Sequence, residues 1–188
     1  MDYAQELARY CRIAEEKGMV NTLEGNLSML ERESGLCYTT PTGRMKLTIT
    51  PQEICVLDAQ GNQVGGTLPR SSEYLLHEAV YAARPDANAV IHSHSPYLTA
   101  YALRYQDFLP PQDCFLGELF PRIVCLPYGR HGTHEIHQGI EQALAKVPIC
   151  LLGGHGVVCC AKDMAGCLGT LEALENLAKT VCLAKMLA

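Results

Sequence analysis

Apolar residues along the chain follow two patterns that predict different secondary structures. Spacings of three and four residues are typical of an amphipathic helix, whereas short apolar runs bounded by turn residues indicate strands. The first helix is expected to follow Asp2, which suits an N-cap, and to end near Lys17 before Gly18. Across the whole chain, helical spacing predicts five helices, at 2–17, 71–83, 96–104, 133–146 and 163–188.

Short apolar runs predict strands that alternate with these helices. Glu33-Ser34-Gly35 has the composition of a hairpin turn, so the segments on either side of it should pair as antiparallel strands. The expected strands span 26–31, 36–40, 54–58, 63–64, 88–94, 123–126 and 149–152. Because helices and strands interleave, the class is α/β, with helices packed on a mixed sheet. No repeat or low-complexity segment divides the sequence, which indicates a single domain over 1–188.

Composition and charge exclude several classes of protein. The chain carries 15 Lys+Arg against 20 Asp+Glu, a formal net charge of −5, and lacks the basic stripe typical of nucleic-acid binding. No apolar stretch approaches the ~18 residues that a membrane span needs. We therefore expect neither nucleic acid nor membrane as a partner. The N-terminus lacks the basic and apolar layout of a signal peptide, which favours a cytoplasmic protein.

The ten cysteines do not form a recognisable metal or redox motif, because no C-x-x-C pair occurs. Most of them sit within apolar runs, as Cys159 and Cys160 do in Val-Val-Cys-Cys-Ala. This placement is typical of small buried hydrophobic side chains in a reducing compartment.

The strongest chemical signal is His92-Ser93-His94, at the end of the expected strand 88–94. Residues i and i+2 of a strand project from the same face, so both imidazoles can reach one metal ion. A zinc site needs a third ligand, and His155 follows another apolar strand in Leu-Leu-Gly-Gly-His-Gly. The alternative is a pair of strand-end histidines that hydrogen-bond only to solvent and loops.

A second signal is Arg70-Ser71-Ser72-Glu73 at an expected helix start. Free backbone amides and two hydroxyls at a helix N-terminus can hold a phosphate or carboxylate. From composition alone, an ordinary helix cap is the simpler interpretation. His131, His134 and His137 follow three-residue steps, which are more typical of a solvated helix start than of a metal site.

Five motifs in order resemble the class II aldolase/adducin family, most closely its L-fuculose 1-phosphate aldolase-like branch. They are Gly25-Asn26-Leu27-Ser28, Thr40-Pro41-Thr42-Gly43, Ser71-Ser72-Glu73 followed by His77, His92-Ser93-His94, and Gly154-His155-Gly156. The resemblance implies a three-layer α/β/α sandwich with a central mixed, largely antiparallel sheet. It also implies a homotetramer that acts on a small-molecule sugar phosphate.

The resemblance also implies roles for individual residues. His92, His94 and His155 would bind one Zn²⁺ per subunit, or another divalent metal, with Glu73 as an additional ligand when substrate is absent. Glu73 would also be the catalytic residue that moves a proton. The residues that would hold the substrate phosphate are Gly25, Asn26, Thr42, Gly43, Ser71 and Ser72. The implied reaction is zinc-dependent cleavage of a ketose 1-phosphate, such as L-fuculose 1-phosphate, into dihydroxyacetone phosphate and a short aldehyde through a metal-stabilised enediolate.

Other reactions would use the same metal site. The alternatives are a methylthioribulose 1-phosphate dehydratase and a sugar-acid phosphate decarboxylase. A non-catalytic adducin-like scaffold is the alternative of a different class, but such modules lose the metal histidines that this chain has. The fuculose-phosphate aldolase branch carries a proton-donating tyrosine in the stretch that matches 111–117, where this chain reads Pro-Gln-Asp-Cys-Phe-Leu-Gly with Asp113 or Cys114 nearest that position.

Overall fold

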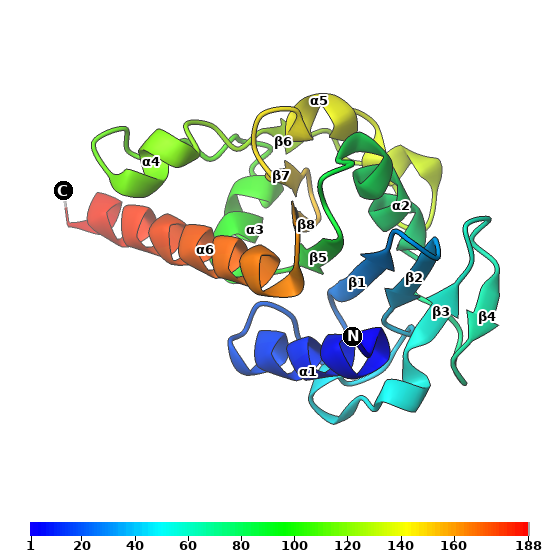
Figure 1. Ribbon diagram of the computed structural model, residues 1–188. Helices are drawn as coiled ribbons and strands as arrows, with labels where there is room; N and C mark the ends of the chain where they lie inside the picture. The colour runs from blue at the N-terminus through cyan, green and yellow to red at the C-terminus, as the bar shows by residue number, and fades with distance from the viewer. Residues whose placement is uncertain (188) are drawn as a thin grey trace.

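The core of the molecule is one sheet of eight strands in the order β4-β3-β2-β1-β5-β8-β7-β6 (Figure 1). The computed structural model describes residues 1–187, so Ala188, at which the expected last helix and domain end, lies outside the described residues. The strands are β1 Asn26–Glu31, β2 Leu36–Thr39, β3 Cys55–Leu57, β4 Gln63–Gly65, β5 Ala89–Ser93, β6 Cys125–Leu126, β7 Ile149–Leu152 and β8 Gly156–Ala161. Every neighbouring pair is antiparallel except β6 and β7, which are parallel.

Helices cover both faces of the sheet, and alternation along the central strands explains why. Neighbouring residues of a strand point to opposite faces, so Val90 and Ile91 of β5 enter different cores. The core that contains Ile91 is completed by α1, α3 and α6, and the core that contains Val90 by α2 and α5. The α-helices are α1 Tyr3–Glu16, α2 Tyr74–Ala83, α3 Pro96–Leu103, α4 Phe115–Leu119, α5 Ile140–Leu144 and α6 Met164–Met186. The expected three-layer α/β/α sandwich is confirmed.

The structure differs from the sequence predictions most clearly in three places. The segment 133–146 is not one helix: it is a 3₁₀ helix, His134–His137, followed by α5. Gly139 separates the two at φ 84°, in the left-handed region that a continuous helix cannot include. Strand β8 was not predicted, because both of its faces are buried and Val-Val-Cys-Cys shows no alternation. The helix expected at 71–83 begins at Tyr74, so Ser71 and Ser72 lie in the turn before it.

The first hairpin agrees closely with the sequence, whereas two of the other strands are shorter than expected. Strands β1 and β2 pair antiparallel around the predicted turn, with Glu31 opposite Leu36. The expected strand 88–94 ends at Ser93, which leaves His94 one residue beyond it. The strand expected at 123–126 is reduced to β6, with Ile123 in a single bridge to Phe108.

A buried carboxylate ties the last helix to the segment that follows His94. Glu175 of α6 is 4% exposed and accepts hydrogen bonds from the backbone N–H groups of Tyr97 at 2.8 Å and Leu98 at 2.9 Å. These N–H groups belong to the first turn of α3 and have no partner within the helix. Glu175 therefore fixes where α3 begins relative to the end of β5.

Replacing Glu175 with alanine is expected to lower the free energy of unfolding by about 2–3 kcal/mol, because two buried N–H groups lose a charged acceptor. Urea unfolding of the purified protein measures this change. Glu172→Ala is the matched control on the same helix, because Glu172 forms a partly exposed ion pair with Lys17. That pair is expected to contribute less than about 1 kcal/mol. Equal losses in the two variants would contradict the capping role of Glu175.

Candidate active site

The end of β5 places two histidines at one edge of the sheet. Strand β5 lies between β1 and β8, where His92 is opposite Asn26 on one side and Val158 on the other. His92 is fully buried, and His94 follows the end of the strand. The Nε2 atoms of these two rings lie 3.0 Å apart. The i, i+2 geometry expected from the sequence is therefore present.

The tight turn between β7 and β8 brings a third imidazole to the same point. The ring of His155 lies 4.7 Å from that of His92 and 4.8 Å from that of His94, measured between centroids. The ring atoms that could bind a metal all lie within 4.8 Å of one another. Gly156 permits this approach, because a Cβ there would lie 2.5 Å from the carbonyl oxygen of Ser93.

A hydrogen bond to the backbone leaves Nε2 of His92 free to bind a cation. His92 Nδ1–H donates to the carbonyl oxygen of Val157 at 3.0 Å, which leaves a lone pair on Nε2. Burial lowers the pKa of His92 to about 3, so the ring is neutral at pH 7. Burial also lowers the pKa of His94, whose Nδ1 lies 3.6 Å from a carboxylate oxygen of Glu24.

Glu73, the N-cap residue of α2, places its carboxylate against the histidines. Its Oε1 lies 3.2 Å from His155 Nε2, and its Oε2 lies 3.4 Å from His92 Nε2. Oε2 also accepts a hydrogen bond from Asn26 Nδ2 at 2.7 Å. Burial raises the pKa of Glu73, but His92, His155 and the Asn26 amide together outweigh burial and hold this pKa well below its ordinary value. The side chain is therefore an ionised carboxylate at neutral pH.

These groups border a cleft of about 370 Å³. His92 lies behind the cleft wall, whereas Glu73, His94 and His155 line it. All six residues expected to hold phosphate line the same cleft: Gly25, Asn26, Thr42, Gly43, Ser71 and Ser72. The structure thus brings together in one place every site residue expected from the sequence.

Backbone pairing joins two of the three segments that carry the expected phosphate residues. The N–H of Thr42 donates to the carbonyl oxygen of Pro69 at 3.0 Å, and the N–H of Ser71 donates to that of Thr40 at 3.2 Å. Ser71 Oγ also accepts from the N–H of Glu73, the N-cap residue, at 3.2 Å and closes the turn before α2. The serine turn therefore leads into α2 and is also part of the cleft wall.

Lys46 and His131 are among the cleft residues that were not predicted from the sequence. Lys46 is 3% exposed, and burial lowers its pKa. It belongs to a 3₁₀ helix, Lys46–Thr48, and a lone lysine in an irregular segment gives no periodic signal. His131, expected on a solvated helix start, also lines the cleft, whereas His134 and His137 do not. Cys114 is the N-cap of α4 and is not among the residues that line the cleft.

Comparisons with known proteins agree with this geometry. The model of the class II aldolase and adducin N-terminal domain matches residues 5–182. The L-fuculose phosphate aldolase of Escherichia coli K12 is 30% identical over 176 residues, which cover 94% of this chain and 80% of that protein. The 3-oxo-tetronate 4-phosphate decarboxylase of the same strain is 29% identical over 181 residues, covering 94% of this chain and 84% of that protein.

A solved structure of an L-fuculose 1-phosphate aldolase superposes with a TM-score of 0.91 at 31% sequence identity, covering 100% of this chain and 88% of that one. The family model spans nearly the whole chain. The chain therefore belongs to the class II aldolase and adducin N-terminal domain family.

Proposed function

We propose that this protein is a zinc-dependent aldolase that cleaves a ketose 1-phosphate, such as L-fuculose 1-phosphate, into dihydroxyacetone phosphate and a short aldehyde. The observation that carries the proposal is the meeting of three imidazoles and an ionised carboxylate in one cleft with hydroxyl and amide groups suited to phosphate. Family membership supports a lyase that acts on sugar phosphates.

In this proposal, His92, His94 and His155 hold one Zn²⁺, and Glu73 is an additional ligand in the absence of substrate. Neutral imidazole nitrogens and a carboxylate are a donor set that suits zinc. The bound cation would supply Lewis-acid stabilisation for negative charge that develops on substrate oxygens. The hydrogen bond from His92 to Val157 keeps the lone pair of Nε2 directed toward the proposed zinc site.

Glu73 is the group placed to move a proton. Cleavage of the bond between C3 and C4 turns the C4 hydroxyl into the aldehyde and releases its proton, while the electron pair left on C3 takes up a proton delivered by Glu73. In the reverse direction, the Glu73 carboxylate, which is ionised in the free site, removes that proton from the carbon beside the carbonyl group. Asn26 holds the carboxylate at one of its oxygens.

The phosphate would lie between the two paired loops. The residues proposed to hold it are Gly25, Asn26, Thr42, Gly43, Ser71 and Ser72. Their amides and hydroxyls can donate hydrogen bonds to phosphate oxygens. The buried ammonium of Lys46 borders the same cleft and adds positive charge there.

A decarboxylase is the second candidate, because one relative of nearly equal similarity is named as a 3-oxo-tetronate 4-phosphate decarboxylase. Loss of CO₂ from a sugar-acid phosphate also leaves an electron pair beside a carbonyl group, so the same cleft would serve. A methylthioribulose 1-phosphate dehydratase would differ in losing water. The presence of all three histidines argues against a non-catalytic adducin-like scaffold.

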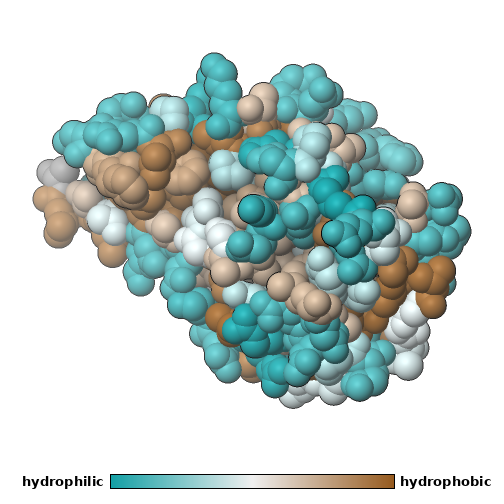
Figure 2. Space-filling model, viewed as in Figure 1, coloured by the Kyte–Doolittle hydropathy of each residue, from teal (hydrophilic) through white to brown (hydrophobic). Residues whose placement is uncertain are grey.

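We also propose that the protein forms a homotetramer in the cytoplasm. Exposed apolar side chains gather over α4 and the end of α6, among them Phe115, Leu119 and Met186 (Figure 2). Patches of this kind commonly mark a protein interface. The ten cysteines are free thiols, which fits a reducing compartment. No helix within the described residues is long and apolar enough to cross a membrane.

Product analysis tests the reaction itself. The zinc-loaded protein is incubated with the 1-phosphates of fuculose, rhamnulose and methylthioribulose, and with a 3-oxo-tetronate 4-phosphate, and the products are identified by NMR. We expect dihydroxyacetone phosphate and an aldehyde from at least one ketose phosphate. Loss of CO₂ or of water without cleavage would replace the aldolase with the decarboxylase or the dehydratase.

His92→Ala is expected to abolish stable metal binding, because it removes one of three nitrogen ligands and cuts the link to Val157. Metal content is measured by mass spectrometry after dialysis against zinc and then against metal-free buffer. The wild-type chain is expected to retain one zinc ion, and so is the control variant His134→Ala, whose side chain lies outside the cleft. Full zinc retention by His92→Ala would refute the assignment.

Glu73→Gln is expected to lower kcat by about 10²–10⁴-fold, the usual contribution of a positioned acid or base. The variant keeps the shape of the side chain but cannot carry the proton. Steady-state kinetics at saturating zinc measure the loss. Glu78→Gln, on the exposed side of the same helix, is the control and should match the wild type. Full turnover by Glu73→Gln would remove the proton role.

A further inference from the structure

Two residues of the family motifs, Ser28 and His77, take no part in the cleft, yet both are buried. Together with Asn26 they form a series of hydrogen-bonded side chains that runs from Glu73 to Tyr81 of α2. Asn26 Nδ2 lies 2.7 Å from Glu73 Oε2, and Asn26 Oδ1 is hydrogen-bonded to His77 Nε2. Ser28 Oγ lies 2.6 Å from His77 Nδ1 and 2.7 Å from the hydroxyl oxygen of Tyr81.

The ionised Glu73 carboxylate at one end of this series determines the direction of every hydrogen bond in it. An ionised carboxylate only accepts, so Asn26 must present its NH₂ group to Glu73 and its carbonyl oxygen to His77. That oxygen can only accept, so His77 carries its proton on Nε2. A neutral imidazole then has an acceptor at Nδ1, which Ser28 must satisfy with its hydroxyl proton. Ser28 Oγ is left to accept from Tyr81, and so every donor points toward Glu73.

The buried environment keeps the groups in the states that this direction requires. Burial lowers the pKa of His77 to about 4, although the Glu73 carboxylate opposes the shift, so the ring is neutral at pH 7. Burial raises the pKa of Tyr81 well above its ordinary value, so its hydroxyl keeps the proton that it donates.

A rotation of the Asn26 amide by half a turn would be costly. Its carbonyl oxygen would then face Glu73 Oε2, and its NH₂ group would face the N–H of His77. Both contacts would place like partial charges together in a buried site, where an unmade hydrogen bond costs about 1–3 kcal/mol. The fixed proton on His77 Nε2 therefore selects one orientation of Asn26.

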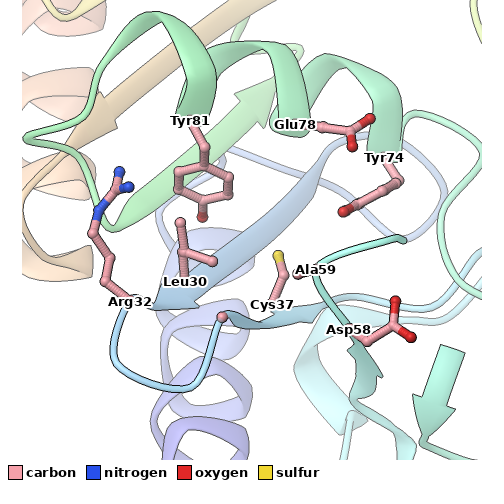
Figure 3. A pocket seen from close by; sticks show the side chains of 9 residues that line it. Leu30, Arg32, Cys37, Asp58, Ala59, Tyr74, Glu78 and Tyr81 are labelled. Carbon is pink, nitrogen blue, oxygen red and sulfur yellow. The ribbon is translucent and has the colours of Figure 1, made fainter. Parts of the chain in front are cut away.

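Tyr81, at the other end of the series, borders a second cavity of about 320 Å³ that is separate from the cleft. Figure 3 shows Tyr81 extending from α2 toward Leu30 and Cys37, with its hydroxyl directed to the sheet. Nothing that lines this cavity belongs to the cleft, so Tyr81 reaches Ser28 from a different side of the molecule than a substrate would.

We propose that His77, Ser28 and Tyr81 are positioning residues that hold the Asn26 amide in one orientation and thereby aim the Glu73 carboxylate. This inference rests on the proposed function, in which Glu73 moves a proton and is an additional zinc ligand. None of the three residues touches the substrate. Their effect reaches the reaction only through Asn26 and Glu73.

The first test observes the proton on His77 directly. In protein labelled with ¹⁵N at histidine, the signals of His77 are assigned by comparison with the His77→Gln variant. We expect a pyrrole-type Nε2 that carries hydrogen and a pyridine-type Nδ1 that does not. A hydrogen on Nδ1 would reverse the series at Ser28 and overturn the proposal.

The second test compares two amides at position 77. In His77→Gln the amide nitrogen reaches the place of Nε2 and can still donate to Asn26, whereas in His77→Asn it lies near the place of Nδ1 and cannot. Zinc affinity, measured by competition with a chelator, is expected to fall by about 10–100-fold in His77→Asn, as is typical when a ligand loses its supporting partner. His77→Gln should stay close to the wild type.

The same pair is compared in turnover at saturating zinc, where His77→Asn should lose kcat to a similar degree and His77→Gln should not. A purely structural role would lower the thermal stability of both variants without separating their zinc affinity or kcat. Equal behaviour of the two variants in zinc affinity would therefore overturn the proposal. If the wild type cleaves no sugar phosphate, the proposed function fails, while the tautomer and the zinc affinities still decide the positioning role.

Discussion

The site depends on the pairing of β5 between β1 and β8. This register sets His92 opposite Asn26 and places the carbonyl oxygen of Val157 behind its ring. Since side chains alternate across a sheet, a slip of one residue would turn His92 to the other face and remove it from the cleft. Backbone hydrogen bonds in the middle of an eight-stranded sheet resist such a slip. The histidine that lies deepest is thus fixed by the most protected part of the fold.

Around this fixed point, the side chains of Asn26, Glu73 and His77 each have a hydrogen-bond partner. Leaving a buried polar group without a hydrogen bond costs more than forming the bond gains, so a partly satisfied network would destabilise the fold. Asn26 serves both sides, because its amide donates to Glu73 and accepts from His77. The tautomer of His92 is set in the same way by Val157. Folding therefore fixes the tautomers of His77 and His92 through their hydrogen-bond partners.

Much of this arrangement could be predicted from the sequence, because the relevant signals are local. Each motif constrains the conformation of its own short segment. This holds for His-Ser-His on a strand, for the glycines around His155 and for the hydroxyls before Glu73. The sequence did not reveal β8, because a strand buried on both faces has no alternation. It also gave no sign that Lys46 enters the cleft, since its place depends on how a 3₁₀ helix packs against α1.

The hydrogen-bonded series from Glu73 to Tyr81 could not be predicted from the sequence. His77 and Ser28 were recognised as motif positions, but Tyr81 carries no motif, and it joins them only because one turn of α2 lies over β1. Such a contact depends on the crossing of a helix and a strand distant in sequence, and no periodic pattern encodes the crossing. The break of the segment 133–146 at Gly139 is a milder case, because one residue of left-handed backbone overrode an otherwise helical pattern.

The edge strands of the sheet affect how copies of this protein can associate. The sheet ends in β4 and β6, which have only 3 and 2 residues, whereas β1 and β8 inside it have 6 each. A long strand at the edge of a sheet exposes unpaired backbone donors and acceptors with which another chain can pair. Short edge strands expose few of these groups. The longest strands are thus shielded inside the sheet, and the short edge strands disfavour assembly by adding strands from one molecule to the next.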